Sequence, residues 1–332
     1  MTTNSLEDVL AACRIAESIL VTSHTGPDGD SIGCTLGMRF LLEALGKKNV
    51  TCASQDAVPR IYAWMPGAAE IVGPEKVQGP YDLVVVLDVA QRARIGRVGE
   101  KLPEDQRFVI IDHHPEEAPF GAINFVDKSY ASCAEIVLEL FDIAELTPSL
   151  DAAIAIYVGL VTDTGSFRYG NTDARALRNA ARLIDLGVDF VDITSRVFDV
   201  MSPAKLELTR RVLTRIERGD CGRFAWSYLN DIDLKQADAS AEDTEGLINY
   251  VRNLEGVEVA AFFRELDGGK VKASLRTRGT VDAGKLLKPL GGGGHFGAAG
   301  VVMRAPLREA IEKVTECIAD ALGPPSTTAS RP

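Results

Sequence analysis

Apolar, β-branched runs without polar alternation are the feature that most constrains the fold of this 332-residue chain. The clearest are DLVVVLDV (82–89) and RFVIIDHH (107–114), and ESILVTSH (17–24) and VTCAS (50–54) are shorter examples. A strand with apolar side chains on both faces is typical of a parallel sheet covered on both sides. Segments with helical spacing of apolar residues, such as residues 30–48, separate these runs. This alternation predicts an α/β fold with a doubly wound, mainly parallel sheet.

The pattern of elements changes after Gly187 and predicts a second, smaller domain. Residues 189–220 are typical of one or two helices broken near Pro203. Strand-like and helical segments follow, including a hairpin around DGG (267–269). We expect a cleft between the two domains. The predicted divisions are an N-terminal domain over 1–188, a helical connector over 189–220, a C-terminal α/β domain over 221–323 and a disordered tail over 324–332.

Composition narrows the class of protein. The net charge of −11 argues against a partner such as long duplex nucleic acid, because that binding needs many Lys and Arg contacts with phosphate. A short phosphorylated ligand needs only a few local cations. The chain has no signal-peptide pattern and no stretch of the ~18 apolar residues that a membrane span requires. Its six cysteines form no CxxC pair, which argues against a Cys-ligated zinc. We therefore expect a cytoplasmic protein without a membrane partner.

Acids and histidines follow four of the apolar segments. They are His24, Asp28 and Asp30 after the first strand, Asp88 after the next central strand, Asp112, His113 and His114 at the third, and Asp163 at the end of a helix over 149–163. Because ligands of an open α/β sheet bind at the carboxyl ends of its strands, we expect these side chains to converge. Taken singly, each aspartate also suits a turn or a helix N-cap, as Asp30 would before SIGCTLG, and His24 suits an ordinary loop. Taken together, five neighbouring carboxylates are costly unless cations neutralise them.

The types of side chain in this set point to a class of metal. Carboxylate and imidazole ligands without thiolate suit Mn²⁺, Mg²⁺, Fe²⁺ or Zn²⁺. Several acids suggest two metals about 3.5–4 Å apart that share one carboxylate, an arrangement suited to in-line displacement at phosphorus. A single metal with a structural role is the alternative.

The glycine run LGGGGHFGAAG (290–300) predicts a loop that binds an anion. It satisfies the GxGxxG spacing, but a short helix precedes it, and no Lys-Ser/Thr follows, so it is neither a dinucleotide fingerprint nor a P-loop. Glycine amides can point at an anion, and the guanidinium groups of Arg276 and Arg278 upstream suit phosphate. A tight turn with surface arginines is the alternative. The predicted substrate-binding residues are Arg276, Gly293, Gly294 and His295.

Four motifs in this chain resemble those of the DHH phosphoesterases, a family named for its Asp-His-His triplet. They are SHTGPDGDSIG, VVVLDVA, VIIDHHP and GLVTDTGSFRYGNT. The segment SLRTRGTVDAGKLLKPLGGGGHFGAAG is similar to the end of the associated C-terminal domain of the family, so the resemblance spans residues 17 to about 303. The chain is most similar to the oligoribonuclease/pAp phosphatase branch. Its members degrade very short RNAs and dephosphorylate 3′-phosphoadenosine 5′-phosphate (pAp).

The resemblance implies a role for each candidate residue. His24 and Asp28 would hold one Mn²⁺, Asp30, His113 and Asp163 would hold a second, and Asp88 would bridge the two. Asp112 would orient a ligand and His114 would face the scissile phosphate, which makes these two the implied catalytic residues. Arg276 and His295, with Gly293 and Gly294, would hold the far end of the substrate.

The implied function is Mn²⁺-dependent hydrolysis of short oligoribonucleotides and pAp. Related alternatives are a phosphodiesterase for cyclic or linear dinucleotides (c-di-AMP, pApA, pGpG) and a pyrophosphatase or exopolyphosphatase. A module that binds nucleotide or RNA without hydrolysis is the alternative outside the enzymes. Relatives in this family are often dimers, so a homodimer is also expected.

Overall fold

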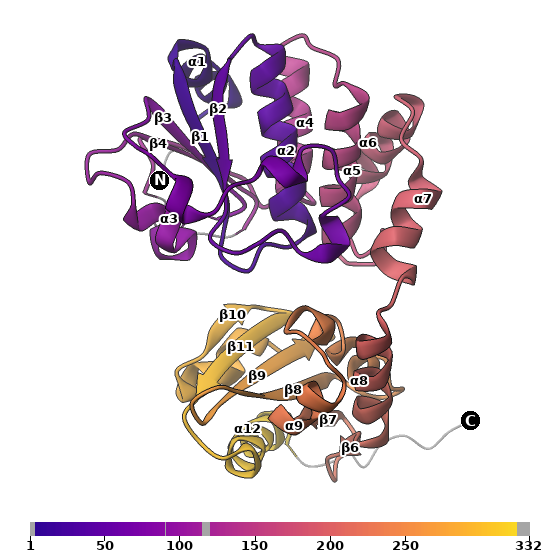
Figure 1. Ribbon diagram of the computed structural model, residues 1–332. Coiled ribbons are helices and arrows are strands. Elements are labelled where there is room, and N and C mark those ends of the chain that lie inside the picture. The colour runs from indigo at the N-terminus through magenta and orange to yellow at the C-terminus, as the bar shows by residue number, and fades with distance from the viewer. Residues whose placement is uncertain (1–3, 90, 115–119, 324–332) are drawn as a thin grey trace. The chain divides into compact units, whose positions relative to one another are not determined.

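The computed structural model of this protein describes residues 4–89, 91–114 and 120–323, which Figure 1 draws in colour. The chain forms two compact units that divide between Val200 and Met201, inside the predicted helical connector. The predicted domain limits and the cleft between the domains stay predictions. The predicted tail lies outside the described residues.

The N-terminal unit is built on a parallel sheet. Within the described residues this sheet has five strands in the order β2-β1-β3-β4-β5, and every neighbouring pair is parallel. The strands are β1 (Ser18–Thr22), β2 (Asn49–Ala53), β3 (Leu83–Leu87), β4 (Phe108–Asp112) and β5 (Ile123–Val126). The predicted α/β fold with a mainly parallel sheet is confirmed. Only β5 was missed, because it is a short edge strand whose residues are all half-buried.

Both faces of the central strands are buried, which explains their unbroken apolar sequence. In β3, Val85 belongs to the larger hydrophobic core, whereas Val84 and Val86 belong to a smaller core on the other face. The larger core includes α1 (Leu6–Ile15), α2 (Gly29–Ala44), α4 (Cys133–Ile143) and α5 (Leu150–Asp163). The smaller core is covered by a 3₁₀ segment (Arg92–Ile95) and α3 (Arg97–Glu100). Figure 1 shows α2, α4 and α5 on one side of the strands and α3 on the other.

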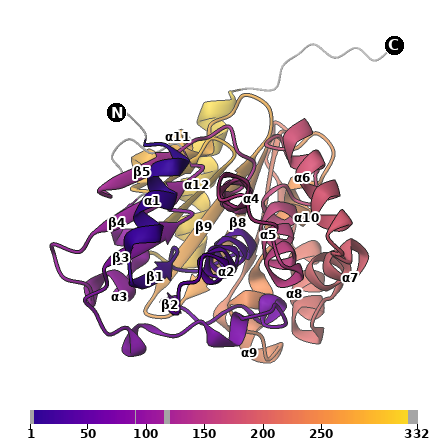
Figure 2. The ribbon, with the colours of Figure 1, turned by 90° about the horizontal axis from the view of Figure 1, so that it is seen from above.

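The helices of the larger core begin at side-chain caps. Asp28 caps α2, Ser132 caps α4 and Ser149 caps α5, each by accepting a hydrogen bond from a backbone amide of the first turn. Figure 2 shows α5 next to α2 and α4, and α6 (Ala174–Asp185) on the side of α5 that faces away from the five-stranded sheet. The unit ends with α7 (Phe190–Thr194) and a π-helical turn (Ser195–Asp199).

Glycines allow α2 and α5 to approach closely. A Cβ atom at Gly33 would lie 2.5 Å from the carbonyl oxygen of Ala155 and 2.7 Å from the amide nitrogen of Gly159. A Cβ atom at Gly159 would lie 2.7 Å from Oδ1 of Asp30. The contact therefore requires glycine on both helices, and it brings the carboxyl end of α5, with Asp163, beside the start of α2.

The C-terminal unit contains a mixed sheet. Among the described residues its order is β10-β11-β9-β8-β7-β6. The strands are β6 (Glu217–Arg218), β7 (Phe224–Leu229), β8 (Val259–Leu266), β9 (Lys270–Thr277), β10 (Gly293–His295) and β11 (Ala298–Met303). The helices are α8 (Pro203–Thr214), α9 (Asp231–Gln236), α10 (Ile248–Arg252), α11 (Ala283–Leu287) and α12 (Leu307–Leu322). As predicted, a helical break precedes Pro203, and β8 and β9 form an antiparallel hairpin around DGG.

The predicted loop over the glycine run is wrong. Residues 293–303 form the antiparallel hairpin β10–β11, and β11 pairs with β9. Glycine lacks the side chains that normally mark a strand, so the sequence pattern did not indicate this hairpin.

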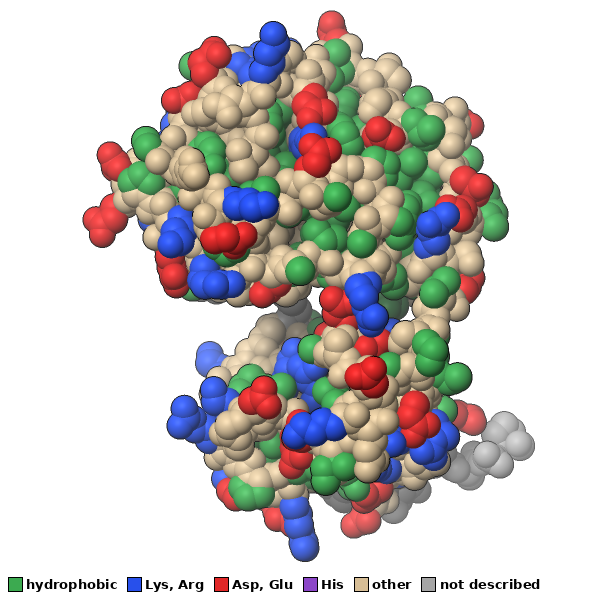
Figure 3. Space-filling view, in the orientation of Figure 1, with side chains coloured by type: hydrophobic (Ala, Val, Ile, Leu, Met, Phe, Trp, Pro, Cys, Tyr) green, Lys and Arg blue, Asp and Glu red, His purple; other side chains and the backbone are tan. Residues whose placement is uncertain are grey.

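The helices and the surface charges of the described residues can be compared with the prediction that the protein binds neither a membrane nor long duplex nucleic acid. None of the helices in these ranges is long and apolar enough to cross a membrane. On the face that Figure 3 shows, the Lys and Arg side chains of the described residues are interspersed with Asp and Glu and form no continuous basic surface. The exclusion of long duplex nucleic acid and the cytoplasmic location stay predictions.

Replacing Gly33 by Ala should destabilise the N-terminal unit. The new methyl group would meet the backbone of α5, so we expect the free energy of unfolding to fall by about 1–3 kcal/mol. The matched control is Gly99→Ala in α3, where the nearest side-chain atom would lie at an ordinary 3.4 Å. Urea unfolding followed by circular dichroism measures both variants. Equal midpoints for the two variants would contradict the proposed close contact.

Candidate metal centre

The structure brings together all eight acids and histidines predicted in the N-terminal unit. They lie at the carboxyl ends of β1, β3 and β4, at the start of α2 or at the end of α5, so the sheet and the contact between the two helices position them jointly. Each lies within 4.0 Å of another member of the set. The eight are His24, Asp28, Asp30, Asp88, Asp112, His113, His114 and Asp163.

His24, Asp28 and Asp88 form the first group of candidate ligands. Nε2 of His24 lies 3.2 Å from Oδ2 of Asp88 and 4.0 Å from Oδ2 of Asp28. Nδ1 of His24 donates a hydrogen bond to the carbonyl oxygen of Thr25 at 2.9 Å, which turns Nε2 toward the carboxylates. The hydroxyl group of Ser31 lies 2.6 Å from this Nε2 and donates to Asp88 at 2.9 Å.

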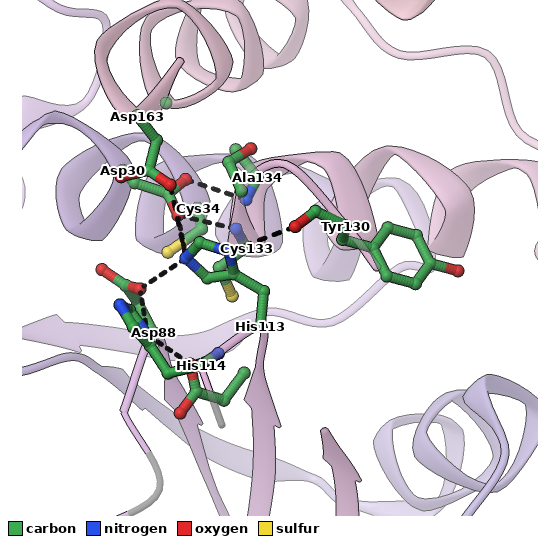
Figure 4. Close-up of polar contacts among 12 residues, drawn as sticks. Asp30, Cys34, Asp88, His113, His114, Tyr130, Cys133, Ala134 and Asp163 are labelled. Carbon is green, nitrogen blue, oxygen red and sulfur yellow. Dashed lines mark hydrogen bonds and ion pairs between the residues drawn. The ribbon is translucent and has the colours of Figure 1, made fainter. Parts of the chain in front are cut away.

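Asp30, His113 and Asp163 form the second group. Nε2 of His113 lies 3.4 Å from the nearest oxygen of Asp163, 3.6 Å from that of Asp88 and 3.8 Å from that of Asp30. Figure 4 shows these three carboxylates pointing toward the same ring nitrogen. Nδ1 of His113 donates to the carbonyl oxygen of Tyr130 at 3.3 Å, so the ring is oriented as in His24.

Asp28 and Asp30 differ in their local contacts. Asp28, not Asp30, is the N-cap of α2, since its Oδ1 accepts from the amide of Ser31 at 3.0 Å. The carboxylate of Asp30 instead accepts from the amides of Cys133 at 2.6 Å and Ala134 at 2.9 Å, at the start of α4. Asp30 is 1% exposed, whereas the side chain of Asp28 is 58% exposed. The alternative that Asp30 serves as a simple helix cap for α2 is therefore wrong.

Asp112 contacts His114 rather than a member of either group. Its Oδ1 accepts from Nδ1 of His114 at 2.8 Å and from the backbone amide of His114 at 3.1 Å. The side chain of His114 is 28% exposed, compared with 7% for His24 and 10% for His113. Nδ1 of His114 also lies 3.4 Å from Asp88, and Asp88, His113 and His114 form a third group of candidate ligands. Asp112 thus orients the most exposed of the three histidines.

The charges of the site are strongly coupled. Burial raises the pKa of Asp30, and the neighbouring charges of Asp88 and Asp163 raise it further. Burial also raises the pKa of Asp163 to about 7, although His113 opposes this shift. Burial alone would raise the pKa of Asp88, but the imidazole groups of His113 and His24 outweigh it and hold this pKa well below its usual range. Burial alone would lower the histidine pKa values, yet the carboxylates raise that of His24 to about 9 and that of His113 to about 10.

These residues fit divalent cations. Nε2 of His113 and Oδ1 of Asp88 are buried and have no hydrogen-bond partner among the described residues. A buried polar atom without a partner is costly. If two ligand atoms each bind a shared ion at about 2.1 Å, they lie roughly 3.0–3.4 Å apart. The three carboxylate oxygens around Nε2 of His113 lie only slightly farther from it, at 3.4, 3.6 and 3.8 Å. Asp88 turns Oδ2 toward His24 and Oδ1 toward His113, so one carboxylate faces both groups.

The residues predicted to bind substrate lie in the C-terminal unit. Arg276 on β9 pairs with Ala298 on β11, which pairs with His295 on β10, so these positions lie in register across the sheet. Gly294 has a φ of +149°, and a Cβ atom there would lie 2.4 Å from the carbonyl oxygen of Ala298. A Cβ atom at Gly293 would meet nothing within 4 Å. The side chain of His295 lies outside the described part of the structure.

Comparison with known proteins identifies the family. Residues 18–160 match the DHH family, N-terminal domain, and residues 222–320 match the DHHA1 domain. A Thermus thermophilus protein named bifunctional oligoribonuclease and PAP phosphatase NrnA is 34% identical over 92% of this chain and 90% of its own length. This chain belongs to the DHH family.

Two further proteins extend the similarity. A Bacillus subtilis protein with the same name is 27% identical, and the alignment covers 88% of this chain and 91% of that protein. A solved structure described as an exopolyphosphatase-related protein from Bacteroides fragilis aligns with a TM-score of 0.87 and 27% identity, covering 94% of this chain and 95% of that one. The family predicted from the four motifs is confirmed.

Sequence reasoning missed Ser31, which touches His24 and Asp88. The residue stands in the first DHH motif, directly after Asp30. Its place in that motif was the available signal, but a serine at a helix start is more often a structural residue.

Replacing Asp163 by Asn should stabilise the metal-free protein and weaken its binding of metal. The pKa of Asp163 is about 7 in the folded chain, whereas its ordinary value is 3.8, so its ionisation disfavours the folded state increasingly from about pH 4 to pH 7. At pH 8 in EDTA we expect the variant to gain roughly 1–2 kcal/mol in free energy of unfolding. With Mn²⁺ added, the wild type should gain more stability than the variant.

Urea unfolding with and without Mn²⁺ measures both effects. Asp82→Asn is the control, because backbone amides of Glu17 and Ser18 lower the pKa of this exposed carboxylate at the opposite end of the sheet. That variant should lose stability equally with and without the ion. A metal-free Asp163→Asn protein less stable than the wild type at pH 8 would contradict the expected cost of the buried charge.

Proposed function

We propose that this chain is a Mn²⁺-dependent phosphoesterase that hydrolyses short oligoribonucleotides and pAp. The observation that carries the proposal is the joining of two candidate ligand groups at Asp88 in a chain of the DHH family. Two relatives whose names state oligoribonuclease and PAP phosphatase match about nine-tenths of the chain, which supports these substrates.

Two divalent cations are proposed as cofactors. His24 and Asp28 would hold the first, Asp30, His113 and Asp163 the second, and Asp88 would contribute one oxygen to each. Bound cations of this kind activate a water molecule for attack and neutralise charge on phosphate oxygens. The protein contributes the fixed geometry, since hydrogen bonds to backbone carbonyls orient both imidazole rings before any ion binds.

His114 is proposed to contact the reacting phosphate. Its ring is anchored by Asp112 and is the most exposed of the three histidines of the site. A ring in this position can donate a hydrogen bond to an oxygen of the scissile phosphate as charge develops there. Asp112 would act through His114 by keeping the ring in one orientation.

The C-terminal unit is proposed to bind the rest of the substrate. Arg276 lies on β9 in register with His295 on β10, and β11 of the glycine-rich hairpin lies between them. A guanidinium group at this position suits a second phosphate, which both pAp and an oligonucleotide possess. A homodimer stays a prediction.

A side-by-side assay with Mn²⁺ tests the proposed substrates. The panel should contain pAp, RNAs of two to five nucleotides, a long RNA, cyclic and linear dinucleotides, and pyrophosphate. We expect the fastest turnover with pAp and short RNA and the slowest with long RNA. Faster hydrolysis of cyclic dinucleotides or of pyrophosphate would favour the corresponding alternative, and binding of pAp without hydrolysis would favour a binding module.

The two adjacent histidines should respond differently to substitution. His113→Ala should weaken Mn²⁺ binding, because it removes the nitrogen that faces three carboxylates. His114→Ala should retain Mn²⁺ but lower turnover by about 10²–10⁴-fold, as expected for loss of a group that acts in the transition state. Isothermal titration with Mn²⁺ and a pAp assay separate the two effects. Equal loss of Mn²⁺ affinity in both variants would instead make His114 a ligand.

A further inference from the structure

One short backbone segment, Tyr130–Ala134, contacts two members of the second ligand group directly. It follows β5 and includes the first two residues of α4. The carbonyl oxygen of Tyr130 accepts a hydrogen bond from Nδ1 of His113 at 3.3 Å. The amides of Cys133 and Ala134 donate to the two carboxylate oxygens of Asp30 at 2.6 and 2.9 Å. Figure 4 shows both sets of contacts converging from the segment toward the candidate metal centre.

Asn171 connects the same segment to the third member of the group. Its Nδ2 donates to the carbonyl oxygen of Ala131 at 2.8 Å and to that of Asp163 at 3.1 Å. The same Nδ2 lies 3.5 Å from Oδ2 of Asp163. The two hydrogens of this amide serve the shorter bonds to the carbonyl oxygens of Ala131 and Asp163, so Asn171 holds Asp163 mainly through its backbone. The side chain of Asp163 is 27% exposed, so packing restrains it less than Asp30 at 1% or His113 at 10%.

A strained turn returns the chain from Asp163 to Asn171. Gly165, Ser166 and Phe167 have successive φ values of +56°, +58° and +60°. This left-handed conformation is unfavourable for residues that carry a side chain, and such strain is often found at functional sites. The turn places the amide of Asn171 against the carboxyl end of α5, eight residues after Asp163.

The buried carboxylate of Glu135 also holds the Tyr130–Ala134 segment. Glu135 is 1% exposed, and its Oε2 accepts from the amide of Ala131 at 2.8 Å. Its Oε1 accepts from Nδ2 of Asn179 on α6 at 2.8 Å. Ala131, which accepts a hydrogen bond from Asn171, is therefore held by Glu135 on α4, and Glu135 is held by Asn179 on α6. Asn171 thus connects Asp163 to a well-anchored part of the backbone.

We propose that Asn171 is a positioning residue that holds Asp163 at the correct distance from the Tyr130–Ala134 segment, and so sets the geometry of the second metal site. The proposal rests on the proposed metal-dependent function. His24 and Asp28 do not contact the segment through any hydrogen bond among the described residues. Loss of Asn171 should therefore impair one of the two proposed ion sites and leave the other intact.

The variant Asn171→Leu tests this role because leucine has a similar branched shape but no donor. Titration with Mn²⁺ alone, followed by electron paramagnetic resonance, reports ion binding without any substrate. We expect one of two Mn²⁺ affinities to fall about tenfold or more, as when a residue that orients a ligand is lost, while the other is unchanged. Asn171→Gln retains the donor on a longer side chain and should recover part of the lost affinity.

Asn124→Leu is the matched control. The side chain of Asn124 also bonds to backbone groups of the N-terminal unit. It donates to the carbonyl oxygen of Gly121 at 2.7 Å and accepts from the backbone amide of Gly121 at 2.9 Å. This variant should lower the urea midpoint of the metal-free protein without changing either Mn²⁺ affinity.

The outcomes separate this proposal from the proposed function. Wild-type affinities in Asn171→Leu would overturn the positioning role, and so would an equal loss of affinity in Asn171→Leu and Asn124→Leu. A wild-type protein that binds no Mn²⁺ would overturn the proposed metal-dependent function itself. Selective loss at one site with partial recovery in Asn171→Gln would support the role.

Discussion

Repulsion among buried carboxylates is the constraint on which the arrangement of the N-terminal unit depends. Asp30, Asp88 and Asp163 all face one nitrogen of His113, and together they have more negative charge than one imidazole can balance. The same environment lowers the pKa of Asp88, because His24, His113 and His114 surround it, and raises that of Asp163, because burial outweighs the effect of His113 there. Divalent cations relieve this repulsion more effectively than protons, since they carry two charges and bind several oxygens.

The fold places these charges together by several independent means. Parallel strands end at one edge of the sheet and deliver His24, Asp88 and His113 to it. The glycine contact between α2 and α5 brings Asp30 and Asp163 to the same edge. Backbone groups then fix the orientation of individual side chains, so the site does not depend on long, mobile side chains for its geometry.

Much of this organisation could be predicted from the sequence because it is local. The unbroken apolar runs indicated buried parallel strands, and the acids after them indicated a site at the strand ends. The four motifs also identified the family correctly. Predictions were wrong where a residue had no distinctive local pattern: the glycine-rich strands at 293–303 were taken for a loop, and Asp30 was considered as a cap for α2.

The sequence by itself determined the order of the elements, the inventory of candidate ligands and the family, because these follow from short-range spacing and residue type. Only the tertiary structure decided which donor each candidate meets. It showed that Asp112 holds His114, that Ser31 lies between His24 and Asp88, and that Asn171 reaches Asp163 and the Tyr130–Ala134 segment. Two of these contacts, Ser31 with Asp88 and Asn171 with Ala131, join segments that are distant in the chain, and Asn171 bonds to backbone carbonyl groups. Every residue carries such groups, so residue type alone cannot reveal which of them a side chain will contact.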